Sequence, residues 1–347
     1  MITMIAIIEQ GLIIGITGLG VFLTFRILDM ADLTVEGSFG LGGALTVSLI
    51  VMGLHPVLAL LISMICGGIA GMITGLIFRK LKVHVLLAGI LVMTMLYSIN
   101  IRIMDGPNLP IPMLTQQTQM SSFEEMSGTD PLADLFGDLE ESAVQEEVLP
   151  VAEDVQAERA LNIFDNARDG SDLMILTGIV GIIICILFIF LKTDLGTVLR
   201  GFGSNPEGVE AFGMSRDFIS ILGLALANVL VSLSGGLFTL YSGFADVTMG
   251  QGMIITGLAM VMVGEIIFGK IKPLFGLIAP IVGGVIYQAI LAIVMRYGYR
   301  IGFRASDMKL LTALFIVSVI AFSLIQNPNK RKKLKGKVKS ICSNSKI

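Results

Sequence analysis

Tryptophan is absent from this sequence of 347 residues, histidine occurs twice and cysteine three times. The histidines (His55 and His84) and the cysteines (Cys66, Cys185 and Cys342) show none of the spacings that zinc sites use. We therefore predict no metal site and interpret the cysteines as small packing residues. Charged residues make up only 15% of the chain, whereas soluble domains carry roughly 25%. This shortage of charge excludes an ordinary soluble globular protein.

Apolar residues account for 54% of the chain, in recurring runs of about 20 residues, a length that crosses the membrane as helix. The sequence therefore predicts an all-α polytopic membrane protein. Its 40 glycines fit a bundle whose helices approach closely. The start, MITMIAIIEQ, lacks the basic region of a cleaved signal peptide, so we expect the first run to be retained. We expect about nine transmembrane helices, near residues 4–27, 38–54, 56–78, 84–104, 173–191, 218–240, 252–269, 273–295 and 308–325.

Lysine and arginine predict the orientation, since they gather in the short cytoplasmic loops of membrane proteins. They occur after the third predicted span (79–82), between the fifth and sixth (192–216), between the seventh and eighth (269–272), and after the ninth. All four clusters fall on one side if nine spans alternate. We therefore expect the N-terminus outside and the C-terminus in the cytoplasm.

Two segments differ in composition from the membrane body. Residues 121–172 contain 15 Asp or Glu and two Arg, without a long apolar run. We predict a flexible, acidic, extracytoplasmic insertion at 113–171, which separates a transmembrane half at 1–112 from another at 172–327. It is either a plain insertion or a docking surface for an external partner.

Residues 328–347 form a predicted basic cytoplasmic tail, with eight Lys or Arg from Lys330 to Lys346 and no acid. Such a tail favours contact with anionic membrane lipid. Nucleic-acid binding is not expected, because the tail contains neither aromatic residues nor a recognition helix.

A short pattern occurs twice. ADLTVEGSFGLGGAL begins at Ala31 and ADVTMGQGMIITGLAM at Ala245, with one inserted residue aligning Gly37 with Gly252. An odd number of predicted spans separates the copies, so they face opposite sides of the membrane, as in an inverted repeat. Chance similarity between two stretches rich in small residues is the alternative.

Such paired, glycine-interrupted elements mark the solute path in transporters that contain inverted repeats. We expect the first copy to shape the cytoplasmic end of the path and the second copy its outer end. Alternatively, Asp32 and Asp246 cap the helices that follow them, and one residue could serve both purposes. The candidate path residues are Asp32, Thr34, Glu36, Ser38, Asp246, Thr248 and Gln251.

The loop between the fifth and sixth predicted spans contains a helix signal of its own. Asn205 is a natural N-cap, Pro206 fits the first helical position, and Glu207 suits the positive end of a helix. Gly213 can end this short helix, near 204–213. The loop is either an ordinary structured loop or a helix that a motor subunit grips.

The same loop, LGTVLRGFGSNPEGVEAFGMS, resembles the coupling segment of permeases from bacterial ABC importers of the branched-chain amino acid and ribose type. ADLTVEGS is similar to the ribose-type segment IDLSVGS, with Glu36 as an extra residue. RILD…DLTVEGSF looks closest to an uncharacterised amino-acid branch, associated with solutes such as tryptophan. By this resemblance, the residues that couple to the ATPase are Arg200, Gly203, Ser204, Asn205, Pro206, Glu207, Ala211, Phe212 and Gly213.

The resemblance implies a type II importer permease in the bacterial cell membrane, paired with a second permease subunit, a copy of itself or a homologue. A cytoplasmic ABC ATPase dimer would drive alternating access, and an extracytoplasmic binding lipoprotein would deliver the solute. The chain lacks a phosphate-binding Gly-x-x-x-x-Gly-Lys-(Ser/Thr) loop, so we expect no enzyme and no cofactor, with ATP used by the partner. It also lacks the additional N-terminal span of ribose-type members, and the acidic insertion departs from the family pattern.

Three other functions stay open on sequence alone. A ribose- or nucleoside-type ABC permease would share most of these features. An ion-coupled secondary transporter, acting alone, would use Asp32 and Asp246 as proton or sodium sites. A membrane scaffold would use the acidic segment to bind an external partner.

Overall fold

The computed structural model of the protein describes residues 2–111, 170–205, 207–211, 213–268 and 273–298, together with six positions between 310 and 318. Most of the predicted acidic insertion, most of the ninth predicted span and the whole basic tail lie outside the described residues. Pro206 and Phe212 of the predicted coupling helix lie outside them as well.

Long helices account for most of the described residues. Seven of them are long and apolar enough to cross a membrane, and one further helix, α11, is shorter but apolar. The predicted multi-pass helical architecture is therefore confirmed, while the count of nine stays a prediction. The bounds are α1 Ile2–Phe22, α2 Thr34–Val51, α3 Pro56–Lys80, α4 Val85–Met104, α7 Gly170–Lys192, α10 Arg216–Ser242, α11 Met253–Phe268 and α12 Pro273–Gly298.

Shorter elements connect the long helices. A π-helical turn, η1 (Leu23–Ile27), extends α1, and two helices, α8 (Asp194–Ser204) and α9 (Gly208–Ala211), lie between α7 and α10. Strand β1 (Asn108–Pro110) pairs antiparallel with strand β2 (Phe244–Asp246). These two short strands are a departure from the purely helical prediction.

Both histidines begin helices. The ring nitrogen Nδ1 of His55 accepts a hydrogen bond from the backbone N–H of Val57 at 3.3 Å, and that of His84 accepts from Leu86 at 3.3 Å. Each ring thus satisfies one of the backbone donors left free at a helix start. The structural role of the two histidines is to cap α3 and α4.

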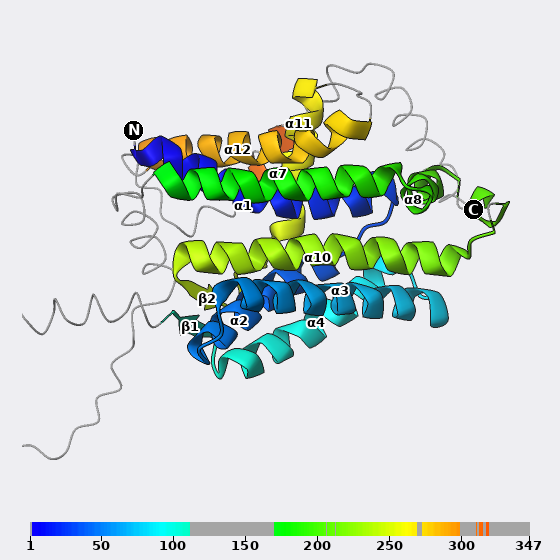
Figure 1. The fold of residues 1–347 in the computed structure, drawn as a ribbon, viewed down its shortest axis with the longest axis horizontal. Coiled ribbons are helices and arrows are strands. Elements are labelled where there is room, and N and C mark those ends of the chain that lie inside the picture. The colour runs from blue at the N-terminus through cyan, green and yellow to red at the C-terminus, as the bar shows by residue number, and fades with distance from the viewer. Residues whose placement is uncertain are drawn as a thin grey trace, which may run out of the picture.

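The bundle has two distinct ends. Helix α8 lies at one end and the pair β1–β2 at the other (Figure 1). Helices α1, α3 and α7 run toward the α8 end, while α2, α4 and α10 run from that side toward the β1–β2 end (Figure 1). Successive long helices therefore alternate in direction, as membrane-crossing helices joined by short connections do.

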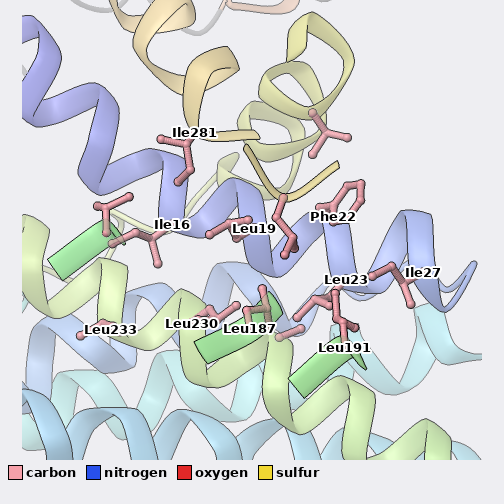
Figure 2. Packing of buried hydrophobic residues seen from close by; sticks show 14 of the residues in the cluster. Ile16, Leu19, Phe22, Leu23, Ile27, Leu187, Leu191, Leu230, Leu233 and Ile281 are labelled. Carbon is pink, nitrogen blue, oxygen red and sulfur yellow. The ribbon is translucent and has the colours of Figure 1, made fainter. Parts of the chain in front are cut away.

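Helices α1 and α10 lie at the centre of the packing. Large apolar side chains from α1, η1, α7, α10 and α12 meet in one buried cluster (Figure 2). The labelled members are Ile16, Leu19, Phe22, Leu23, Ile27, Leu187, Leu191, Leu230, Leu233 and Ile281.

Glycines stand where these helices cross most closely. A Cβ on Gly71 of α3 would lie 2.4 Å from the carbonyl oxygen of Leu224 on α10. A Cβ on Gly11 of α1 would lie 2.6 Å from the Cα of Val285 on α12. Only glycine permits these backbone approaches, which explains part of the high glycine content.

The packing partners follow a pattern. α1 packs against α12, and α10 packs against α3. α2 packs against α3, and α11 packs against α12. These are the contacts expected if α1, α2 and α3 correspond to α10, α11 and α12, so they support the inverted repeat, which stays a prediction.

Two helix starts differ from the sequence prediction. α2 begins at Thr34, four residues before the predicted start at 38, because Glu36 is accommodated in its first turn, where a carboxylate favours the helix dipole. Residues 194–204, expected as loop, form α8, and Thr193 Oγ1 caps it by accepting from the N–H of Gly196 at 3.3 Å.

Candidate functional site

The two copies of the repeated pattern form the same local turn. The backbone N–H of Thr34 donates to Asp32 Oδ1 at 2.9 Å, and that of Thr248 donates to Asp246 Oδ1 at 2.7 Å. In each copy the aspartate therefore holds the backbone of the threonine two residues later. Both are local turns: the N-cap residue of α2 is Leu33, without a side-chain cap bond, and α11 starts only at Met253. The capping of these helices by Asp32 and Asp246 therefore stays a prediction.

Asp32 is enclosed by the bundle, with an exposed fraction of 0%. Asn228 Nδ2 on α10 donates to Asp32 Oδ2 at 2.8 Å. The hydroxyls of Thr34 and Thr74, on α2 and α3, are 2.7 Å apart and hydrogen-bonded.

The position of Asn228 along α10 shows how deep in the bundle its partner Asp32 lies. Asn228 lies 12 residues after Arg216 and 14 residues before Ser242, which places it about 18 Å from the start of the helix. Asp32 thus lies level with the middle of α10. The connection between η1, which ends at Ile27, and α2, which begins at Thr34, therefore lies inside the bundle. That Asp32 shapes the cytoplasmic end of the solute path stays a prediction.

Asp246 and Thr248 occupy the β1–β2 end. Asp246 is the last residue of β2 and opposes Asn108 of β1. Its carboxylate is 8% exposed and also accepts a hydrogen bond from the hydroxyl of Thr248. This pair lies at the β1–β2 end of the bundle, and Asp32 lies elsewhere.

Glu36 connects the two copies of the pattern. Its carboxylate lies beside the backbone N–H groups of Gly252 and Ile254, at the start of α11, which favour its charged form. A Cβ on Gly250 would lie 2.0 Å from the carbonyl oxygen of Glu36, so the second copy runs in backbone contact with α2. The carboxylate of Glu36, in the first turn of α2, thus lies at the positive N-terminus of α11, where a negative charge is favourable.

α2 and α11 leave this meeting point in opposite directions. α2 continues to the β1–β2 end, where Ser48 Oγ donates to the carbonyl of Ile103 near the end of α4. α11 continues toward the α8 end, where Arg26 of η1 and Glu265 of α11 form an ion pair, with Nη2 to Oε2 at 2.9 Å. Two helix N-termini therefore meet inside the bundle.

An open depression of about 230 Å³ lies at this meeting point. Of the predicted path residues, Glu36 and Gln251 line it together, whereas Ser38 is fully buried and does not. The two residues were expected at opposite ends of the path; the inward course of residues 247–252 brings them together. The depression is lined by Glu36, Gly37, Met93, Thr94, Tyr97, Asn100, Val247 and Gln251.

Four of the lining residues come from α4, which the sequence analysis did not single out. A signal was present, since Thr94, Tyr97 and Asn100 recur every three residues in a mostly apolar span. That spacing places polar groups on one face of a helix. Among the described residues, no group of three or more His, Cys, Asp or Glu could hold a metal ion.

The predicted coupling segment is built on α8 and α9. Asn205 Oδ1 accepts from the N–H of Gly208 at 3.1 Å, which is N-capping geometry. Gly213 follows α9 with φ +74°, a conformation that favours glycine. A Cβ on Gly203 would lie 2.1 Å from the carbonyl oxygen of Ile27, so α8 packs directly on η1.

Other residues predicted to couple to the ATPase lie on the same segment. The side chains of Asn205 and Glu207 are exposed, and the Arg200 guanidinium donates to the hydroxyl of Thr197 at 3.2 Å. Nothing is described for Pro206 and Phe212, or for the side chains of Ser204 and Ala211.

Known proteins are similar to this sequence over most of its length. The family described as branched-chain amino acid transport system permease components matches residues 3–320. A tyrosine transport system permease protein of Clostridioides difficile (strain R20291) is 33% identical over 319 residues, covering 91% of this chain and 90% of the relative. An uncharacterized protein of Rickettsia prowazekii (strain Madrid E) is 32% identical over 250 residues, covering 72% of each chain.

Among solved structures, PsaBC from Streptococcus pneumoniae in complex with Fab is similar, at 16% identity and a TM-score of 0.47. The superposition covers 91% of this chain and 89% of the other. The family match confirms the resemblance in the sequence, and the chain belongs to the family described as branched-chain amino acid transport system permease components.

Proposed function

We propose that this permease is the transmembrane subunit of an ATP-driven importer for an amino acid. In this proposal a cytoplasmic ABC ATPase dimer supplies the energy and an extracytoplasmic binding protein delivers the solute. The α8 end faces the cytoplasm, the β1–β2 end faces outside, and the bacterial cell membrane holds the chain with its N-terminus outside and C-terminus inside.

The observation that carries the proposal is the meeting of the N-termini of α2 and α11 inside the bundle. Transporters place their solute sites near the bilayer midplane, where the N-termini of discontinuous helices converge. α2 and α11 start at such a point, and the carboxylate of Glu36 joins them. Irregular backbone at this depth is tolerated only against protein or a water-filled space.

The chemistry of the depression suits an amino acid with a large side chain. Met93, Tyr97 and Val247 offer an apolar and aromatic wall, while Glu36 and Gln251 offer polar groups. A carboxylate attracts the ammonium group of an amino acid, and an aromatic wall packs against its side chain. The relative named as a tyrosine transport permease supports an aromatic solute.

A second permease subunit completes the path in this proposal. The depression is open, and Glu36 on its wall is an acid at membrane depth. Such acids face protein or water, and hydrocarbon is a costly neighbour for them. The open side of the depression therefore faces a second copy of the chain, and the solute moves between the two copies.

The test is transport by the purified system. The permease is co-purified with the ATPase and binding protein encoded beside its gene, reconstituted in proteoliposomes, and supplied with radiolabelled tyrosine, leucine or ribose. We expect uptake of an amino acid that requires ATP inside and binding protein outside. Uptake by the permease alone under a proton or sodium gradient would overturn the proposal in favour of a secondary transporter, and uptake of ribose alone would overturn the solute class.

A further inference from the structure

Arg79, in the last turn of α3, has a side chain that is only 20% exposed. Its Nε donates to Ser220 Oγ at 2.7 Å, and its Nη2 donates to the carbonyl oxygen of Arg216 at 3.3 Å. Both acceptors belong to the first turns of α10. The guanidinium group thus fixes the end of α3 to the start of α10.

The same guanidinium group also reaches α8. Its central carbon lies 5.6 Å from the ring centroid of Phe202 on α8 and 4.6 Å from that of Phe78 on α3. Phe202 is 2% exposed, so its ring is held in place by the surrounding bundle. A planar guanidinium can stack on rings and donate in its plane at once, which a lysine ammonium cannot.

The three helices that meet at Arg79 connect the α8–α9 segment with the residues that hold the start of α2. α3 carries Thr74 and α10 carries Asn228, and these two hydrogen-bond Thr34 and Asp32 at the start of α2. α8 leads directly into α9 at the end of the bundle where α3 ends and α10 begins (Figure 1). A displacement of α8 therefore reaches α3 and α10 through this contact.

We propose that Arg79 is a positioning residue that transmits motion of the α8–α9 segment to α3 and α10, and through them to the start of α2. The inference rests on the proposed function, because it requires an ATPase that moves α8–α9. Loss of this residue uncouples ATP hydrolysis from solute movement and leaves the assembly with the ATPase intact.

The ion pair between Arg79 and Asp217 is not the contact that transmits motion from α8 to α3 and α10. Arg79 Nε and Asp217 Oδ1 are 3.4 Å apart, and the Asp217 side chain is 66% exposed. Exposed pairs of this kind contribute little, because water and salt screen them. The contacts to Ser220, the Arg216 carbonyl and Phe202 are the more enclosed ones.

The experiment measures solute uptake and ATP hydrolysis in the same proteoliposomes, with loaded binding protein outside. Arg79→Gln should lower the number of solute molecules moved per ATP by about two- to thirtyfold, the range typical of residues that carry coupling. Arg79→Lys keeps the positive charge but lacks the planar guanidinium group, and should recover only part of the ratio of solute moved to ATP hydrolysed. Phe202→Leu keeps an apolar side chain and should lower the ratio in the same direction.

Lys192→Gln is the matched control. Lys192 ends α7 near α8, and its ammonium group lies 4.6 Å from the ring of Phe188 on its own helix. Removing this cation should leave the ratio of uptake to hydrolysis unchanged. ATPase co-purification with each variant shows whether assembly is intact.

The outcomes separate the inference from the proposed function. An unchanged ratio in assembled Arg79→Gln and Phe202→Leu overturns the inference while ATP-driven uptake by the unmodified protein stands. Absence of ATP-driven uptake in the unmodified protein overturns the proposed function itself. If Arg79→Gln fails to assemble, Phe202→Leu and Arg79→Lys decide, and wild-type ratios in both overturn the inference.

Discussion

Asn228 Nδ2 donates a hydrogen bond to Asp32 Oδ2 at 2.8 Å, although 196 residues separate the two along the chain. Both groups are fully buried. A buried carboxylate is costly unless hydrogen bonds satisfy it, so this contact stabilises the break between α1 and α2. It ties the first copy of the repeated pattern to the helix that precedes the second.

Replacement of Asn228 by Ala should destabilise the protein. The substitution removes a donor from the buried Asp32 carboxylate, which costs about 1–3 kcal/mol of unfolding free energy. Thermal unfolding in detergent measures the change, with Asn108→Ala in exposed β1 as a control that should be near neutral. The exchange Asp32→Asn with Asn228→Asp should restore part of the loss, and an exchange no better than the single variant would contradict this account.

Replacement of Gly250 by Ala should displace residues 247–252 from α2. The added Cβ would lie 2.0 Å from the carbonyl oxygen of Glu36, and such overpacking costs about 1–3 kcal/mol or more. Gly178→Ala in α7 is the matched control, because nothing lies within 4 Å of its Cβ position. The control should keep wild-type stability and uptake, and equal behaviour of the two variants would argue against the close approach.

Replacement of Glu36 by Gln should weaken both stability and transport. The change keeps the shape of the side chain but removes the charge at the N-terminus of α11, worth up to about 2 kcal/mol in partly buried geometry. Uptake of amino acid and thermal unfolding are the measurements. Asp105→Asn, at an exposed acid with φ +52° that Asn also tolerates, should change neither. Wild-type uptake in Glu36→Gln would remove Glu36 from the solute path.

Replacement of Asn205 by Ala should impair coupling to the ATPase. It removes the acceptor for the N–H of Gly208, and loss of such a cap costs about 1 kcal/mol. We expect weaker ATPase co-purification and slower ATP-driven uptake, with recovery in Asn205→Asp, which retains the acceptor oxygen. Normal ATPase binding and uptake in Asn205→Ala would argue that the contact surface lies elsewhere.

Cysteine labelling should establish the orientation. Lys80 ends α3 at the α8 end, whereas Met52, 76% exposed, follows α2 at the β1–β2 end. In a variant without the three native cysteines, a membrane-impermeant maleimide should label Met52→Cys in intact cells. Lys80→Cys should react only after the membrane is opened, and the reverse pattern would invert the proposed topology.

The sequence determined the class of protein, the approximate position of the spans that the structure describes, and the two copies of the pattern. These follow from local quantities, namely the length of apolar runs, the scarcity of charge, and the recurrence of Ala-Asp-x-Thr at 31 and 245. The cap at Asn205 and the glycine at 213 were also predictable, because capping depends on neighbours along the chain.

Only the tertiary structure decided which of these residues meet. It placed Asp32 against Asn228 inside the bundle, brought Glu36 to the start of α11, and added Tyr97 of α4 to the same depression. Each of these contacts joins segments that are distant in sequence, so no local pattern specifies it. The requirement for glycine at a position such as Gly250 depends on the helix that faces it, here the backbone of α2 at Glu36.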